Sequence, residues 1–171
     1  MTHSLTEPSA WVRRHAALIR PSARVLDLAA GRGRHATLTG VAGVRTLAAD
    51  LEAGAWPLAG ERFDAIVVAN YLHRPSFDAM LGTLADDGVL VYETFAAGNE
   101  ALGRPTNPDF LLAAGELLEQ VRGRLAVVAF EEGHRDARRR PGGRAAPRGR
   151  GAAARAAVAP PLRVGPAGLA G

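Results

Sequence analysis

The 171-residue sequence contains no cysteine and no lysine. Without cysteine the chain can form neither a disulfide nor a thiolate metal site, and it has no thiol nucleophile. No stretch approaches the roughly 18 apolar residues of a membrane-spanning helix, and residues 1–8 lack the basic and apolar regions of a secretory signal peptide. These absences predict a cytoplasmic protein that does not enter a membrane, and no metal site is predicted.

Charge is distributed unevenly along the chain, whose net charge is +4. Residues 1–132 hold 12 arginines and 16 acidic residues, which gives −4, while residues 133–171 hold nine arginines and one acid, Asp136, which gives +8. The first part therefore offers no basic stripe for RNA or DNA, and nucleic acid is not an expected partner. Because every basic residue is arginine, the composition indicates a GC-rich coding bias rather than a phosphate-binding surface.

Residues 133–171 also differ in composition from the rest of the chain. Glycine, alanine, arginine and proline supply 33 of these 39 residues, against 54 of the 132 before them. Their codons can carry only G or C in the first two positions, so a GC-rich gene read out of frame would give such a stretch. The alternatives are a disordered linker or an arginine-glycine arm that binds nucleic acid, although no aromatic residue is interleaved for base stacking. We expect this tail to be disordered and to stay outside a folded domain of residues 1–132, because it has too few apolar groups to offset its ordering entropy.

Apolar periodicity predicts helices and strands in alternation, with Ser9 as the cap of the first helix. Helices are expected over residues 8–19, 77–84 and 111–121 and from about residue 33 onward, and strands over residues 24–28, 44–49, 63–69, 89–93 and 125–130. Strands separated by helical patterns indicate an α/β fold, in which helices cover both faces of a parallel sheet.

The glycine-rich turn after the first strand carries the strongest functional signal. Gly31, Gly33 and Ala36 match the G-x-G-x-x-G/A fingerprint of dinucleotide sites, but this match alone is weak. Asp27, at the end of the strand, would repel a pyrophosphate and so opposes a nicotinamide-dependent oxidoreductase. The same carboxylate would attract a ligand with an ammonium and a sulfonium group, which predicts S-adenosyl-L-methionine as the cofactor.

Residues 25–36 resemble motif I of the class I S-adenosylmethionine-dependent methyltransferases, whose pattern is acidic-x-Gly/Ala-x-Gly-x-Gly. Asp27, Ala29, Gly31 and Gly33 occupy its positions. The chain is similar to a small bacterial branch of these enzymes related to the tellurite-resistance type, over about residues 11–132. The likeness continues through residues 49–52, 63–73, 89–95, 98–100 and 105–112.

The resemblance implies a Rossmann-like fold and a site at the carboxyl ends of its strands. The motif I turn would hold the methionine moiety, with Asp27 near the positive end of the ligand. Asp50 and Leu51 would lie against the adenine. Asn70 would lie under the methionine end, at the end of the strand over residues 63–69.

Only 16 residues separate Gly33 from Asp50, too few for the helix, second strand and following helix of the family, since a βαβ unit takes about 30 residues. One interpretation is that the acid that binds the ribose hydroxyls is absent. The other is that residues 44–49 pair beside the first strand and that Asp50 takes the ribose role. The tail also replaces the final strands, so the sheet is predicted to lack one βα unit and the final strand pair.

We therefore predict a methyltransferase that acts on a small-molecule acceptor, or alternatively a non-catalytic, degenerate relative. Methyl transfer is an in-line displacement that depends mostly on holding the nucleophile and the methyl group in position. Tyr71 and His73 follow a strand end and are the candidate catalytic residues, because either could orient or deprotonate the acceptor. The oligomeric state is not predicted.

Overall fold

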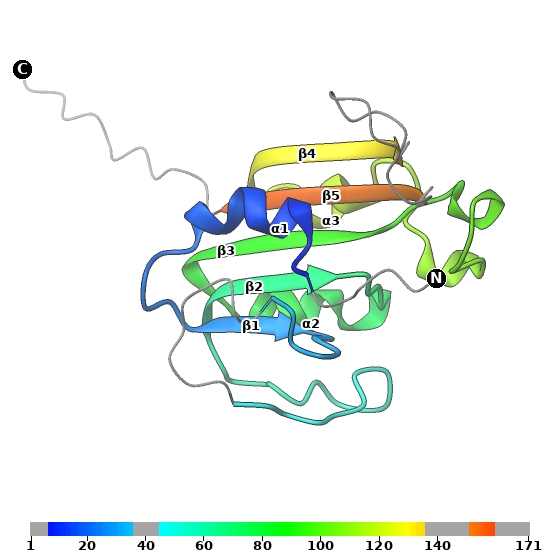
Figure 1. Ribbon diagram of the computed structural model, residues 1–171. Helices are drawn as coiled ribbons and strands as arrows, with labels where there is room; N and C mark the ends of the chain where they lie inside the picture. The colour runs from blue at the N-terminus through cyan, green and yellow to red at the C-terminus, as the bar shows by residue number, and fades with distance from the viewer. Residues whose placement is uncertain (1–6, 36–44, 136–150, 160–171) are drawn as a thin grey trace, which may run out of the picture.

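The computed structural model describes residues 7–35, 45–135 and 151–159, which form a mixed five-stranded sheet in the order β1-β2-β3-β5-β4 (Figure 1). The strands are β1 (Val25–Leu28), β2 (Phe63–Ala69), β3 (Leu84–Phe95), β4 (Ala126–Arg135) and β5 (Gly151–Ala159). β1, β2 and β3 are parallel, whereas β5 is antiparallel to both β3 and β4. The predicted α/β, Rossmann-like fold class is confirmed.

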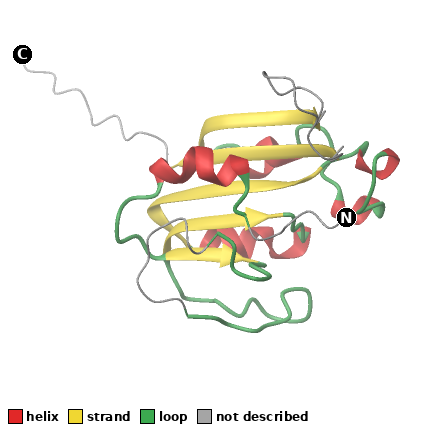
Figure 2. Cartoon of the chain, in the orientation of Figure 1, coloured by secondary structure: helices red, strands yellow, loops and turns green. Residues whose placement is uncertain are grey.

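Helices cover both faces of this sheet, as predicted (Figures 1 and 2). α1 (Ala10–His15) lies on one face, and α2 (Phe77–Gly82) and α3 (Glu116–Val121) lie on the other. Short 3₁₀ turns are formed by Ala16–Leu18, Arg74–Ser76, Asn99–Ala101 and Pro108–Phe110. No helix in the described ranges is long and apolar enough to cross a bilayer.

The start of α1 shows how local sequence positions a helix on the sheet. The Ser9 hydroxyl accepts hydrogen bonds from the backbone N–H groups of Trp11 (3.1 Å) and Val12 (3.4 Å), which confirms the predicted cap. Trp11 and Val12 are then buried in an apolar cluster with Val91 and Ala157 of the sheet. The opposite face is a larger cluster, in which α2 and α3 contribute Phe77, Met80, Leu81, Leu117 and Val121.

The tail supplies an interior strand, so the expectation that all of residues 133–171 stay outside the core is wrong. β5 pairs with β3 on one side and with β4 on the other. Its buried side chains are fully enclosed: Ala154, Ala156, Ala157 and Val158. Alanine suits this place because both faces are covered closely; the Trp11 indole N–H, for example, reaches the Ala156 carbonyl at 3.4 Å. β4 and β5 also form an antiparallel pair, so the predicted lack of a final strand pair is wrong as well.

The segment before β2 has less regular structure than predicted. Residues 45–50 are exposed and have no regular structure, so the strand expected over residues 44–49 is not formed within the described chain. Leu47, for example, is 56% exposed, because no neighbouring element covers it. Accordingly, no strand lies on the outer side of β1 among the described residues. The interpretation that placed Asp50 at the end of such a strand is therefore wrong.

Two predicted helices also differ from expectation. The helix predicted from about residue 33 lies mostly in residues 36–44, outside the described residues, and residues 31–35 form turns. The helix predicted over residues 111–121 begins only at Glu116. Before it, Leu112 forms a parallel bridge to Ala96 and is held in an extended conformation.

Candidate functional site

The backbone turns sharply where β1 ends. Ala29, Gly31 and Gly33 have left-handed φ angles of +52°, +57° and +72°, and the Gly33 N–H donates to the Ala30 carbonyl at 2.9 Å. A Cβ atom built on Gly31 or Gly33 would meet no atom of the described residues within 4 Å. Glycine is therefore favoured here by the conformation of the backbone, and the described chain leaves space beside the turn.

Asp27 lies just before this turn with an unsatisfied carboxylate oxygen. Its side chain is 11% exposed, and the buried Oδ2 has no hydrogen-bond partner in the described chain. Oδ1 lies 3.5 Å from Nδ1 of the buried His35, whose Nε2 accepts from the Ser9 backbone N–H at 3.3 Å. An accepting Nε2 places the ring proton on Nδ1, toward Asp27. Because buried polar atoms normally have partners, the free oxygen indicates a place for a cation or a hydrogen-bond donor.

The chain also turns sharply at the end of β2. Asn70 has a left-handed φ of +60°, and its N–H donates to the Glu93 carbonyl at 2.9 Å. The Tyr92 hydroxyl donates to the Tyr71 carbonyl at 2.7 Å. These two bonds from β3 fix the segment that follows β2, so that Asn70 and Tyr71 are presented at the carboxyl edge of the sheet.

A cavity of about 250 Å³ lies at this edge. It is lined by Glu52, Asn70, Tyr71, Leu72, Thr94, Phe95, Pro105 and Phe110. The carboxyl ends of parallel strands are where ligands bind in such sheets. Of the predicted site residues, Asn70 and Tyr71 line this cavity, whereas Asp27, Ala29, Gly31 and Gly33 form a separate group at the end of β1.

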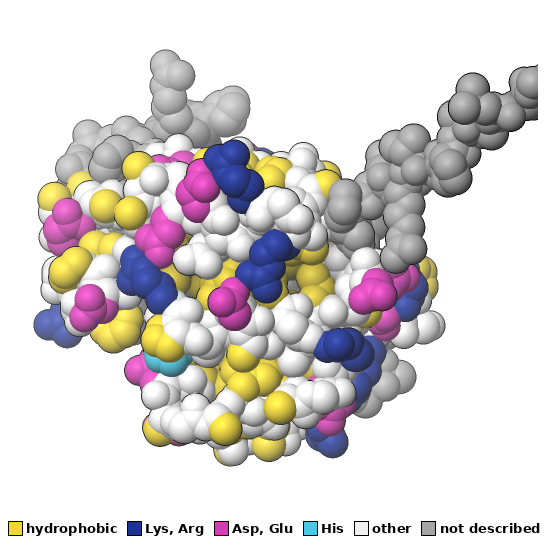
Figure 3. Space-filling view, turned by 180° about the vertical axis from the view of Figure 1, so that it is seen from behind, with side chains coloured by type: hydrophobic (Ala, Val, Ile, Leu, Met, Phe, Trp, Pro, Cys, Tyr) yellow, Lys and Arg dark blue, Asp and Glu magenta, His cyan; other side chains and the backbone are white. Residues whose placement is uncertain are grey.

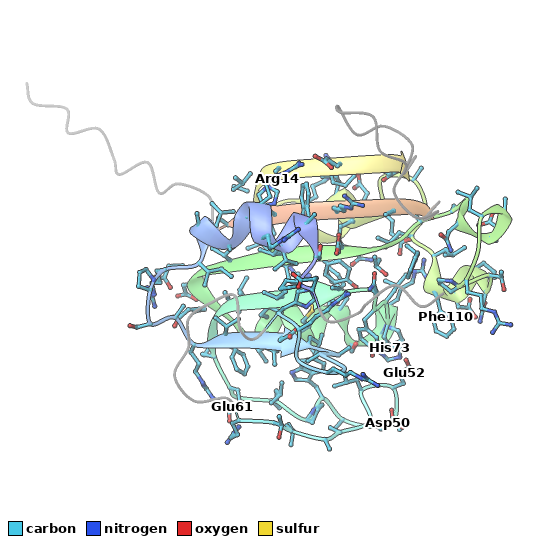
Figure 4. The ribbon with its side chains drawn as sticks, viewed as in Figure 1. Arg14, Asp50, Glu52, Glu61, His73 and Phe110 are labelled. Atoms are coloured by element: carbon cyan, nitrogen blue, oxygen red, sulfur yellow. The ribbon has the colours of Figure 1, made fainter. Side chains whose placement is uncertain are left out.

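The two candidate catalytic residues have different surroundings. The Tyr71 hydroxyl is buried. Burial is the main cause of its raised pKa; the charges of Glu52 and, less strongly, Asp50 also raise the pKa, and the Ser76 hydroxyl lowers it. His73 does not line the cavity. Its Nδ1 lies 2.9 Å from the Ser76 hydroxyl, which itself donates to the His73 carbonyl. Figure 4 shows His73 at the same edge of the sheet as Glu52.

The Asp50–Leu51 pair lies in the irregular segment that leads to the cavity. The Asp50 carboxylate is exposed and accepts from the Glu52 backbone N–H at 2.9 Å. Leu51 is half-buried against the larger apolar cluster. The sequence did not point to Glu52 or to Phe110 as site residues, although both belong to segments that carry the family resemblance.

Arg74 holds the outer wall of the cavity in place. Its guanidinium group donates two hydrogen bonds to the Glu116 carboxylate, at 2.6 and 2.9 Å. It also donates to the backbone carbonyls of Asp109 (2.7 Å) and Leu111 (2.8 Å), the two neighbours of Phe110. The side chain of Arg74, in the 3₁₀ turn that follows β2, therefore fixes the segment that carries Phe110.

This clamp predicts a pH dependence. The hydrogen bond from Arg74 is the main reason why the pKa of Glu116 is lowered from its ordinary value of 4.5. The stabilisation is therefore complete above pH 4.5 and is lost as the pH falls through the lowered pKa. We expect Glu116→Gln to reduce the free energy of unfolding by about 1–2 kcal/mol at pH 7, and urea unfolding should show this difference shrink at acidic pH. The exposed Glu119→Gln is the matched control and should change little; a difference for Glu116→Gln that does not depend on pH would contradict the clamp.

The fold is similar to that of a solved methyltransferase. The structure is similar to TehB from Haemophilus influenzae, a tellurite-resistance methyltransferase, with a TM-score of 0.68 and 19% sequence identity. The match covers 90% of this chain and 63% of TehB, so the chain spans less than two thirds of that protein.

A weaker match is the N-methyltransferase NodS from Bradyrhizobium japonicum WM9, with a TM-score of 0.45 and 20% identity over 78% of this chain and 68% of NodS. No family model and no curated protein sequence matches the chain. At 19% identity the likeness to TehB shows the fold alone, and that fold agrees with the predicted Rossmann-like class.

Proposed function

We propose that this chain is an S-adenosyl-L-methionine-dependent methyltransferase that acts on a small-molecule acceptor in the cytoplasm. The observation that carries the proposal is the buried Oδ2 of Asp27, which has no hydrogen-bond partner among the described residues and lies beside the glycine turn. A carboxylate in this place suits a ligand with a positive end, and it would repel a phosphate. The methyltransferase-type fold supports the same conclusion.

The described residues fit this cofactor. Asp27 would accept hydrogen bonds from the positive methionine end, while Ala29, Gly31 and Gly33 form the turn that the methionine moiety approaches. Asn70 would contact the same end from β2, and the bound cofactor supplies an electrophilic methyl group on its sulfonium. On the adenine side, Asp50 and Leu51 would provide a polar and an apolar contact.

The acceptor would enter the cavity at the ends of β2 and β3. A volume of about 250 Å³ suits a small molecule. Tyr71 would orient the acceptor from the cavity lining, and His73, at the same edge of the sheet, would receive the proton. On the face that carries α2 and α3, acidic and basic side chains are interspersed, which does not suggest a nucleic-acid surface (Figure 3).

A non-catalytic, degenerate relative is the second candidate. It is favoured by the exposed, irregular course of residues 45–50 and by the bare outer side of β1 in the described chain. Such a protein would bind the cofactor weakly or not at all. Transfer of a radiolabelled methyl group to any acceptor would rule it out.

Calorimetry with S-adenosylhomocysteine tests the cofactor site. We expect binding to the wild-type chain, and about ten- to a hundredfold weaker binding to Asp27→Asn, because charge-assisted hydrogen bonds contribute about 1.5–3 kcal/mol. Asp86→Asn, at an exposed position near the start of β3, is the matched control and should bind as the wild type does. Tighter binding of NAD than of S-adenosylhomocysteine would contradict the proposal.

A further inference from the structure

The cavity extends away from the proposed cofactor turn. It is lined by Asn70 to Leu72, which follow β2, by Thr94 and Phe95 of β3, and by Phe110. No residue of the turn after β1 lines it. The space is therefore placed for a second ligand, next to the methionine end of the cofactor.

The walls of this cavity combine aromatic rings with one negative charge. Tyr71, Phe95 and Phe110 contribute the rings, and Glu52 is the charged residue among those that line it. Phe110 is 43% exposed and lies at the same edge as Glu52 (Figure 4). Aromatic faces and a carboxylate are the groups that attract an organic cation.

The charges of two carboxylates act on the Tyr71 hydroxyl, which belongs to the cavity lining. After burial, the charge of Glu52 is the largest cause of the raised pKa of Tyr71, and that of Asp50 adds to it. The basic residue nearest in sequence to the lining of β2, Arg74, is engaged with Glu116 and with two backbone carbonyls. Arg74 is therefore not available to neutralise Glu52, while Arg104, next in sequence to the lining residue Pro105, is exposed.

We infer that the acceptor is a small organic amine, held in this cavity by Glu52 and by the rings of Tyr71, Phe95 and Phe110. This inference rests on the proposed methyltransferase function and names its substrate class. It uses the cavity lining, which is independent of the Asp27 group that supports cofactor binding.

The chemistry of the transfer suits these walls. The nitrogen lone pair forms the new N–CH₃ bond while the S–CH₃ bond breaks and its electron pair stays on sulfur, so the positive charge moves from sulfur to nitrogen. A tertiary amine releases no proton, whereas a primary or secondary amine then gives one to water or to Glu52. The charge that develops on nitrogen is stabilised by Glu52 and the rings, so these groups bind the transition state better than the neutral amine.

Binding of choline to the full chain tests the cation preference, with 3,3-dimethylbutan-1-ol as its uncharged isostere. NMR titration should give at least fivefold tighter binding of choline. Glu52→Gln and Phe110→Leu should each weaken choline binding about two- to fivefold and leave the isostere unchanged. Glu119→Gln, another exposed glutamate, should not change the binding of either compound.

Cofactor binding is measured in a separate experiment, so that failure of the amine inference can be distinguished from failure of the proposed function. Dimethylaminoethanol should be methylated to choline, and Glu52→Gln should slow this reaction without changing the affinity for S-adenosylhomocysteine. If S-adenosylhomocysteine binds but choline is not preferred over its isostere, the amine inference is overturned and the proposed function stands. Competition between choline and S-adenosylhomocysteine would assign the cavity to the cofactor and also overturn it. Choline binding without any S-adenosylhomocysteine binding would overturn the acceptor role.

Discussion

A chain that ends at Arg150 should lose cooperative folding, because it lacks β5. The four enclosed side chains of this strand, three alanines and Val158, contribute about 4–5 kcal/mol of apolar burial. A domain of this size has a total stability of about 5–15 kcal/mol. Removal of the strand would also leave the inner edges of β3 and β4 without hydrogen-bond partners.

The matched control is a chain that ends at Ala159, which keeps every described residue. Urea unfolding followed by circular dichroism should show a cooperative transition for this control and none, or one at much lower urea, for the chain that ends at Arg150. Equal midpoints for the two chains would mean that β5 does not belong to the folded sheet.

Replacement of Arg155 should strongly destabilise the sheet. Its guanidinium group lies between two carboxylates of neighbouring strands, 3.4 Å from Glu93 and 3.7 Å from Glu131. The side chains of Arg155 and Glu93 are only 13% and 11% exposed. We expect Arg155→Met to destabilise the protein by about 3–5 kcal/mol, because it leaves a buried carboxylate without its cation.

A double-mutant cycle separates this effect from lost packing. Glu93→Met added to Arg155→Met should restore much of the stability, since no unpaired charge then remains. Arg14→Met is the control, because Arg14 also pairs with Glu131 but is 63% exposed and should contribute little. Urea unfolding at pH 7 measures these three variants and the single Glu93→Met that completes the cycle. If the double variant is no more stable than Arg155→Met, the buried pair is not the cause.

The predictable parts of the fold are those whose signal is local. The apolar runs of β1 and β2, and the hydroxyl of Ser9 ahead of α1, determine their structure largely within a few residues. The state of β5 depends instead on what covers it: its alanines are apolar enough only because strands flank it on both sides and helices lie over both faces. Residues 44–49 show the reverse, a strand-like pattern that has no neighbouring strand to pair with in the described chain.

The same distinction applies to the candidate site. Asn70 and Tyr71 could be predicted because they directly follow a strong strand, and the cavity forms there. Arg74 and Glu116 are 42 positions apart, and the contact of His35 with Ser9 spans 26. No pattern within a short window indicates such pairs, so the support of Asp27 and the clamp on the cavity wall emerge only from the folded chain. The roles in the site remain predictions for all of its candidate residues: Asp27, Ala29, Gly31, Gly33, Asp50, Leu51, Asn70, Tyr71 and His73.

Among the described residues β1 is an edge strand, and this has a consequence for how a ligand would be recognised. In sheets of this kind a binding crevice forms where the strand order reverses, so that protein lies on two sides of the ligand. Here the described strands run from β1 in one direction only. A cofactor at the β1 turn would be flanked by β2 on one side and by no described strand on its ribose side. Recognition would then depend on the amino-acid half of the molecule, and the chain should tolerate altered nucleosides far better than an altered methionine.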